Sequence, residues 1–156
     1  MKDELWQKIR RFRLDEGALP FSRRLAGENG WETAYAQRAI MEYKRFMYLI
    51  CHTRKTCCPS DEVDQVWHLH LLYTRSYWID FCRHTLGREI HHGPTKGGGT
   101  ERIKHEDMYL ATLGLYREVF GKEPPADIWP PADKRFEPVQ YVRLPKQKYF
   151  IFKKPF

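Results

Sequence analysis

The residues best suited to chemistry lie in one segment of the chain, between Asp64 and His92. An acid, a tryptophan and two histidines fall within the seven residues from Asp64 to His70, and His91-His92 follow further along. Carboxylate and imidazole groups are ligands for Zn²⁺ and Fe²⁺. A carboxylate also orients and charges a histidine without any metal. The segment therefore predicts either a metal site or an Asp–His pair.

The spacing within this segment limits which residues can share a site. On an α-helix, Asp64 and His68 are four residues apart and share a face. His68 and His70 are separated by about 200° around the helix axis and face opposite ways. We therefore expect one histidine to pair with Asp64 and the other to occupy a different environment.

The reach of the chain sets a second condition on the site. If one helix ran unbroken to Leu86, His68 would lie about 27 Å from its end. The few residues from Leu86 to His91 or His92 span at most about 20 Å when fully extended. A site that joins His68 to either of them therefore requires an interruption of the helix, for which Thr74 is the expected place.

Cys82 is a further candidate ligand. It shares the face of Asp64 by angle, but in a straight helix it lies about 27 Å away and needs the same interruption. Alternatively, the two late histidines cluster with Cys82 and His84, or Cys82 is a small buried hydrophobic residue. The candidate metal ligands are therefore Asp64, His68, His70, Cys82, His91 and His92.

Positive charge offers a different kind of site. Arg75 and Arg83 lie on the same predicted helix and suit a small anionic ligand or an acidic partner. The formal net charge is +7, spread over runs at 8–13, 23–24 and 146–154. No nucleic-acid-binding motif accompanies these runs. They favour a solvated basic surface, with weak RNA or phosphate contact as the alternative.

The periodicity of apolar residues predicts a mainly α fold, an irregular bundle of about four to five helices with a Pro-rich, partly extended C-terminal tail. Ser60 is the expected N-cap of the histidine-bearing helix, and Gly87 its stop. The extended stretches are expected at Val139–Leu144 and Tyr149–Phe152. The expected helices cover residues 2–14, 21–26, 31–52, 60–86 and 100–120.

We expect a single domain over 1–156, with a helical core at 1–136 and a basic extended tail at 137–156. No apolar run approaches the ~20 residues that cross a bilayer, and the first residues do not resemble a secretory signal. We therefore expect a cytoplasmic protein without membrane contact. The four cysteines show no regular framework and are expected to be free thiols.

The motifs of the central segment resemble those of the glycine-rich domain-containing protein-like family, in its short bacterial form, over about residues 20–136. They are Pro59-Ser60, Val63-Asp64, Val66-Trp67-His68-Leu69-His70, Tyr77, Cys82, Leu86-Gly87 and His91-His92-Gly93-Pro94. The resemblance implies that Asp64, Trp67, His68, His70 and His92 are motif positions. Trp67, Tyr77, Gly87 and Pro94 are the structural members of the pattern. The family grouping itself implies no defined activity.

The functional expectation is a small metal-binding domain that uses Asp and His ligands for Zn or Fe, with a metal-dependent enzyme as its extension. The alternative is a non-enzymatic module that binds a protein partner, or weakly RNA, and whose His, Asp and Trp cluster is a structural polar network. A straight helix from Asp64 to Leu86 would favour the network, and an interrupted one permits the metal site.

Overall fold

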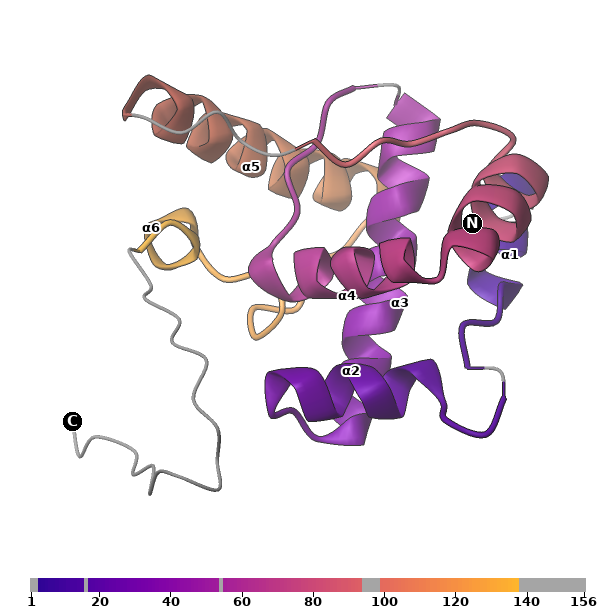
Figure 1. Ribbon diagram of the computed structural model, residues 1–156. Coiled ribbons are helices and arrows are strands. Elements are labelled where there is room, and N and C mark those ends of the chain that lie inside the picture. Colours follow the sequence, from indigo (N-terminus) through magenta and orange to yellow (C-terminus); the bar gives the residue numbers. More distant parts are fainter. Residues whose placement is uncertain (1–2, 16, 54, 94–98, 138–156) are drawn as a thin grey trace, which may run out of the picture.

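The structure is a computed structural model that describes residues 3–15, 17–53, 55–93 and 99–137 (Figure 1). It is mainly α, as the sequence predicts, and the described residues contain no strand. The described elements are α1 (Glu4–Arg11), α2 (Phe21–Asn29), α3 (Thr33–Thr53), α4 (Asp61–Leu72), η1 (Arg75–Leu86), α5 (Gly99–Phe120) and α6 (Ala132–Arg135). Pro94 and the expected tail at 137–156 lie outside the described residues, except for Glu137.

The described residues form seven helices, more than the expected four to five. One addition comes from the predicted helix 60–86, which is divided into α4 and η1. The other is α6, a short helix after Pro131 in a segment that the prolines were expected to keep irregular. Pro is tolerated at a helix start because its missing N–H would have no intrahelical partner there.

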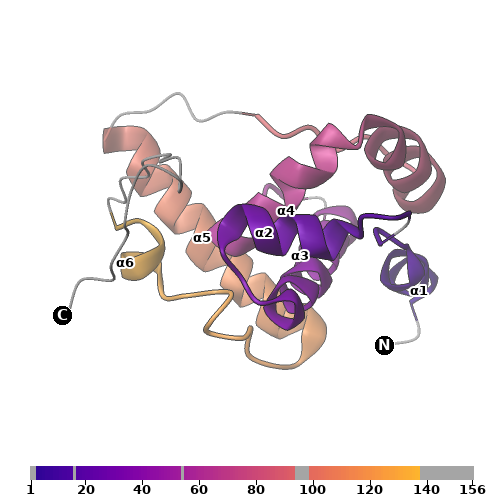
Figure 2. The same ribbon diagram turned by 60° about the horizontal axis from the view of Figure 1, so that its bottom comes forward.

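The central element is α3, against which α1, α2, α4 and α5 all pack (Figure 1 and Figure 2). Its buried side chains include Ala36 and Ala39, which permit close approach, and the aromatic residues Tyr43, Phe46 and Tyr48. In both views α5 extends away from the other helices, with α6 against it. No helix in the described part of the chain is long and apolar enough to span a membrane.

A buried carboxylate ties the Pro-rich segment to this core. Glu42 on α3 is 3% exposed, and its Oε2 accepts hydrogen bonds from Tyr116 Oη at 3.0 Å and Trp129 Nε1 at 3.1 Å. Its other oxygen accepts from Arg45. Trp129, which lies between two pairs of prolines in the sequence, is therefore fixed on the core.

The helix that carries the site begins and ends as expected, and it is interrupted at Tyr73 and Thr74, where a site shared with His92 requires a break. Ser60 Oγ accepts a hydrogen bond from Val63 N at 3.2 Å, which caps α4, and Gly87 ends η1 with a left-handed φ of 69°. Between them, Tyr73 leaves the helical conformation with φ −88° and ψ 64°. The chain resumes as the π-helix η1, which turns away from α4 (Figure 1).

Contacts with α2 hold the side chain of Tyr73 at this interruption. Its ring lies 5.4 Å from that of Phe21 and 5.5 Å from the Arg24 guanidinium, measured between ring centroids and to the guanidinium carbon. Arg24 also donates to Tyr73 Oη at 3.4 Å. The sequence around Tyr73 contains no Gly or Pro, so these tertiary contacts, rather than a local breaker, mark the position.

Candidate metal site

The interruption brings three of the sequence-predicted ligands together. Asp64 and His68 lie one turn apart on α4, and His92 comes from the segment that follows η1. One donor atom from each of the three side chains lies within 4.8 Å of the other two. This is the one group of three or more potential ligands that the described residues form.

The carboxylate of Asp64 lies between two imidazoles. His92 Nε2 is 2.7 Å from Asp64 Oδ1, and His68 Nδ1 is 3.6 Å from Asp64 Oδ2. The two imidazole rings are 4.5 Å apart between centroids. The side chains of Asp64 and His92 are 18% and 19% exposed, whereas that of His68 is 52% exposed. The cluster is therefore closed on one side and open to solvent at His68.

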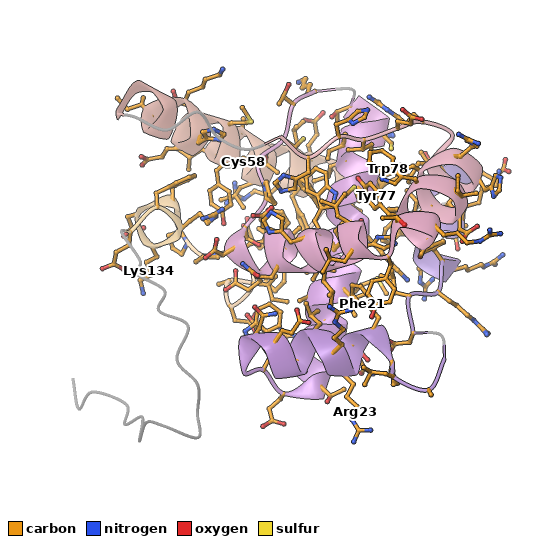
Figure 3. The ribbon with its side chains drawn as sticks, in the orientation of Figure 1. Phe21, Arg23, Cys58, Tyr77, Trp78 and Lys134 are labelled. Carbon is orange, nitrogen blue, oxygen red and sulfur yellow. The ribbon has the colours of Figure 1, made fainter. Side chains whose placement is uncertain are left out.

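A chain of hydrogen bonds positions His92. The indole of Trp67 packs against the His92 ring with centroids 4.3 Å apart and donates from Nε1 to Tyr77 Oη at 2.8 Å. Tyr77 Oη in turn donates to the carbonyl oxygen of Ile90. Tyr77, labelled in Figure 3, thus joins α4 to the returning segment just before His92. Burial raises the pKa of Tyr77, which keeps its hydroxyl protonated as a donor.

His70 lies in a separate environment, as its spacing from His68 predicts. It is fully buried, with Nδ1 2.9 Å from Tyr43 Oη and Nε2 3.1 Å from Ser76 Oγ. Burial lowers the pKa of His70 to about 3, and the charge of Lys44 contributes in the same direction. His70 is therefore a neutral core histidine with both ring nitrogens engaged, and it does not join the Asp64 cluster.

The other candidate ligands also lie elsewhere. Cys82 is fully buried in the core, where burial raises its pKa. His91 is 74% exposed and lies 3.6 Å from Glu89, next to the ring of Trp78. The alternative cluster of Cys82 and His84 with both late histidines does not form, because His92 lies against Asp64. All four cysteines are free, as expected.

Arg75 and Arg83, the predicted anion-binding pair, are exposed on η1 and form no ion pair with any residue that the structure describes.

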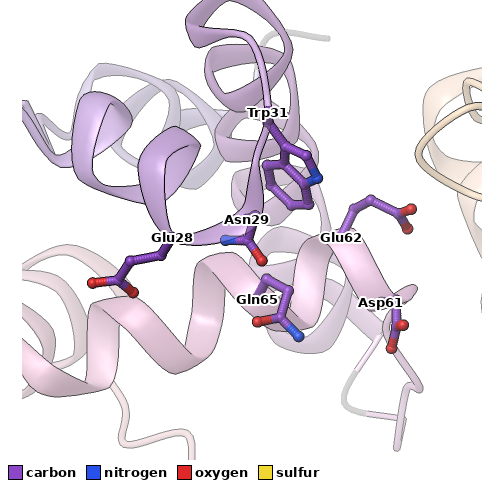
Figure 4. Close-up of a pocket in the computed structure, with 6 residues that line it drawn as sticks. All are labelled: Glu28, Asn29, Trp31, Asp61, Glu62 and Gln65. Carbon is purple, nitrogen blue, oxygen red and sulfur yellow. The ribbon is translucent and has the colours of Figure 1, made fainter. Parts of the chain in front are cut away.

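Sequence reasoning missed a hollow of about 390 Å³ between the end of α2 and the start of α4 (Figure 4). Trp31, Gln65 and three acids are among its lining residues, and one oxygen of Glu62 is buried there without a hydrogen-bond partner. Burial raises the pKa of Glu62. The only sequence signal was the acidic start of α4.

Comparison with known proteins places the site within a family. Residues 7–111 match the UCP032817-like family, a range that includes all three clustered residues. The match begins earlier and ends sooner than the 20–136 expected from the motifs. No solved structure matches significantly.

Two plant proteins are similar to the chain over the same region. It is 29% identical over 93 residues to glycine-rich domain-containing protein 2 of Arabidopsis thaliana. It is 30% identical over 92 residues to glycine-rich domain-containing protein 1 of the same plant. These matches cover 56% of this chain but only 12% and 11% of the two relatives. The expected likeness to glycine-rich domain-containing proteins is thus confirmed, and the chain belongs to the UCP032817-like family.

Proposed function

We propose that this protein binds a divalent transition-metal ion, Zn²⁺ or Fe²⁺, through Asp64, His68 and His92. The observation that supports the proposal is the convergence of one carboxylate and two imidazole donors within 4.8 Å of one another. Two donors come from one helix face and the third arrives from 24 positions further along the chain, after a helix interruption. If Asp64 and His68 were only solvated residues on a helix surface, His92 would not need to lie beside them.

The distances suit a metal ion after small side-chain movements. With metal–nitrogen bonds of about 2.0–2.1 Å in tetrahedral geometry, neighbouring ligand atoms lie about 3.3 Å apart. His92 Nε2 and Asp64 Oδ1, now 2.7 Å apart, would separate by about 0.6 Å. The donor atoms of all three side chains, which now lie within 4.8 Å of one another, would move to the same spacing. Metal binding would replace the His92–Asp64 hydrogen bond and require both imidazoles to be neutral.

Three protein ligands leave part of the coordination sphere for water or a substrate. Structural zinc sites use four protein ligands, whereas catalytic zinc sites and two-His, one-carboxylate iron sites keep positions open. The 52% exposure of His68 puts the open side toward solvent. The proposal therefore extends to a metal-dependent enzyme in the cytoplasm. Its substrate would reach the metal from the His68 side.

The competing interpretation is a structural polar network in a protein-interaction module. The 2.7 Å contact between His92 Nε2 and Asp64 Oδ1 favours it, because this hydrogen bond holds the two side chains together and needs no metal ion to do so. In that case His68, half exposed and 3.6 Å from the carboxylate, contributes little. The two functions therefore differ in the role of His68.

The adjacent residues His91 and His92 provide a test variant and its matched control. The protein is loaded with Zn²⁺ or, without oxygen, with Fe²⁺, freed of excess metal by gel filtration and subjected to elemental analysis. We expect one metal per chain in the wild type and in His91→Ala, whose side chain is 74% exposed. We expect none in His92→Ala. A metal-free wild type, or equal losses in both variants, would overturn the proposal.

A further inference from the structure

A second hollow lies away from the histidine cluster, where α1 ends against α3. Its volume is about 400 Å³, and four cationic side chains are among the residues that line it: Arg10, Arg11, Arg13 and Lys44. Asp15 is the one acid among the described residues of the lining. Three of these cations belong to the basic run at 8–13, for which the sequence favours a solvated surface. The fourth, Lys44, lies 31 positions beyond Arg13 in the middle of α3.

Lys44 is an unusual lysine because it is buried. It is 7% exposed, and its ammonium donates to the carbonyl oxygens of Arg10 at 3.1 Å and Phe12 at 2.6 Å. These carbonyls belong to the C-terminal end of α1, whose partial negative charge the ammonium therefore offsets. Burial lowers the pKa of Lys44, and an anion bound beside it would favour the charged form.

The acid in this hollow is already engaged. Both carboxylate oxygens of Asp15 accept hydrogen bonds from Ser22, one from the backbone N and one from Oγ, each at 2.7 Å. The backbone carbonyls at the end of α1 are taken by Lys44. The negative groups of the lining are thus satisfied by neighbours other than the three arginines.

The three arginines of the hollow differ from several other arginines of the chain in having no acidic partner among the described residues. Arg24, Arg38 and Arg117 each pair with a carboxylate at 2.7–2.9 Å. Arg10, Arg11 and Arg13 form no side-chain hydrogen bond or ion pair with any residue in the described parts of the chain. Among the described lining residues, four cationic side chains stand against one carboxylate, which leaves an excess of positive charge around the hollow.

We propose that this hollow binds a phosphate-bearing ligand. Guanidinium groups match the oxygens of a phosphate in bidentate geometry, and no side chain in the described parts of the chain engages the donors of these arginines. A hollow of 400 Å³ admits a group of diphosphate size. The proposal is independent of the metal site, because it shares no residue with it.

The test uses inorganic pyrophosphate as the probe and isothermal titration calorimetry at low salt. The double variant Arg11→Gln/Arg13→Gln removes two charges from the hollow, and Lys104→Gln/Lys122→Gln removes two from exposed positions on and after α5. Losing two charge-assisted contacts should weaken pyrophosphate binding about tenfold or more, and the control double should change it less than about twofold. Equal weakening in both doubles would assign binding to net charge and overturn the proposal, as would no binding by the wild type.

Two further ligands distinguish the source of the phosphate. ADP and a short single-stranded RNA are titrated under the same conditions with the same variants. Tighter binding of ADP, at one per chain, identifies a free phosphate ester as the ligand. Tighter binding of RNA that weakens steeply with salt identifies a nucleic-acid backbone. In both cases only Arg11→Gln/Arg13→Gln should abolish the preference, and circular dichroism confirms that the variants are folded.

Discussion

His92 Nε2 lies 2.7 Å from Asp64 Oδ1, although 28 positions and an interrupted helix separate the two residues in the sequence. The contact depends on the departure of the chain from α4 at Tyr73 and on the bond from Tyr77 to the Ile90 carbonyl. An unbroken helix to Leu86 would keep His92 beyond the reach of Asp64. The contact between His92 and Asp64 therefore depends on both α4 and η1 and on the break between them.

The half-exposed His68 gives a prediction that separates metal binding from folding. His68→Ala should remove stoichiometric Zn²⁺ binding and change the free energy of unfolding of the metal-free protein by less than about 0.5 kcal/mol, because the side chain is 52% exposed. Urea unfolding with chelator present measures the stability. His92→Ala should cost about 1 kcal/mol under the same conditions, since it breaks the bond to Asp64. Retention of metal by His68→Ala would favour the structural network.

Removal of the Tyr77 hydroxyl should destabilise the fold. Tyr77→Phe leaves the Trp67 indole N–H and the Ile90 carbonyl without their buried partner, which predicts a loss of about 1–3 kcal/mol in the free energy of unfolding. The Zn²⁺ affinity should also fall, because the segment that carries His92 is released. Tyr73→Phe is the control, since its hydroxyl only accepts from Arg24 at 3.4 Å. Equal stability of both variants would contradict the role assigned to Tyr77.

Stability should fall with acid because of His70. Its pKa is about 3 in the folded protein and near 6.5 when unfolded, so the unfolded state takes up the proton first. The stability that depends on neutral His70 is fully present above pH 6.5 and is lost as the pH falls from there toward 3. Between pH 7.5 and pH 5 this predicts a loss of about 2 kcal/mol. In His70→Gln this part of the pH dependence of urea unfolding should disappear, whereas the exposed His84→Gln should keep it.

The buried Glu42 should be far less replaceable than an exposed acid with a similar partner. Glu42→Gln disturbs acceptors used by Arg45, Tyr116 and Trp129, and breaking a buried charge pair of this kind costs about 3 kcal/mol or more. Glu123→Gln, which alters an exposed pair with Arg117, should cost less than about 1 kcal/mol. Thermal unfolding of the two variants compares them. A similar melting temperature for both would refute the anchoring of Trp129 by Glu42.

Local signals predicted the ends of the site helix and the separation of its histidines. Ser60 and Gly87 act through their own side chain and backbone, so their roles can be read from single residues. The opposite placement of His68 and His70 follows from helix geometry alone. The need for an interruption near Thr74 followed from chain reach, but only if a shared site existed.

The remaining features depend on contacts between distant segments. Tyr73 carries no local breaker signal, and its position is marked by packing on Phe21 and Arg24 of α2. The choice of His92 over His91 is decided by Trp67 packing and by the Tyr77 bond to Ile90. The sequence pattern kept both histidines as candidates because neither contact has a signature in the spacing.

The central claim is that Asp64, His68 and His92 share one metal ion. The most direct measurement is a crystal structure of the Zn²⁺-loaded protein with anomalous data collected at the zinc edge. We predict one anomalous peak within about 2.0–2.2 Å of a donor atom from each of the three residues. An undisturbed His92–Asp64 hydrogen bond, with no peak there or with zinc bound elsewhere, would contradict the claim.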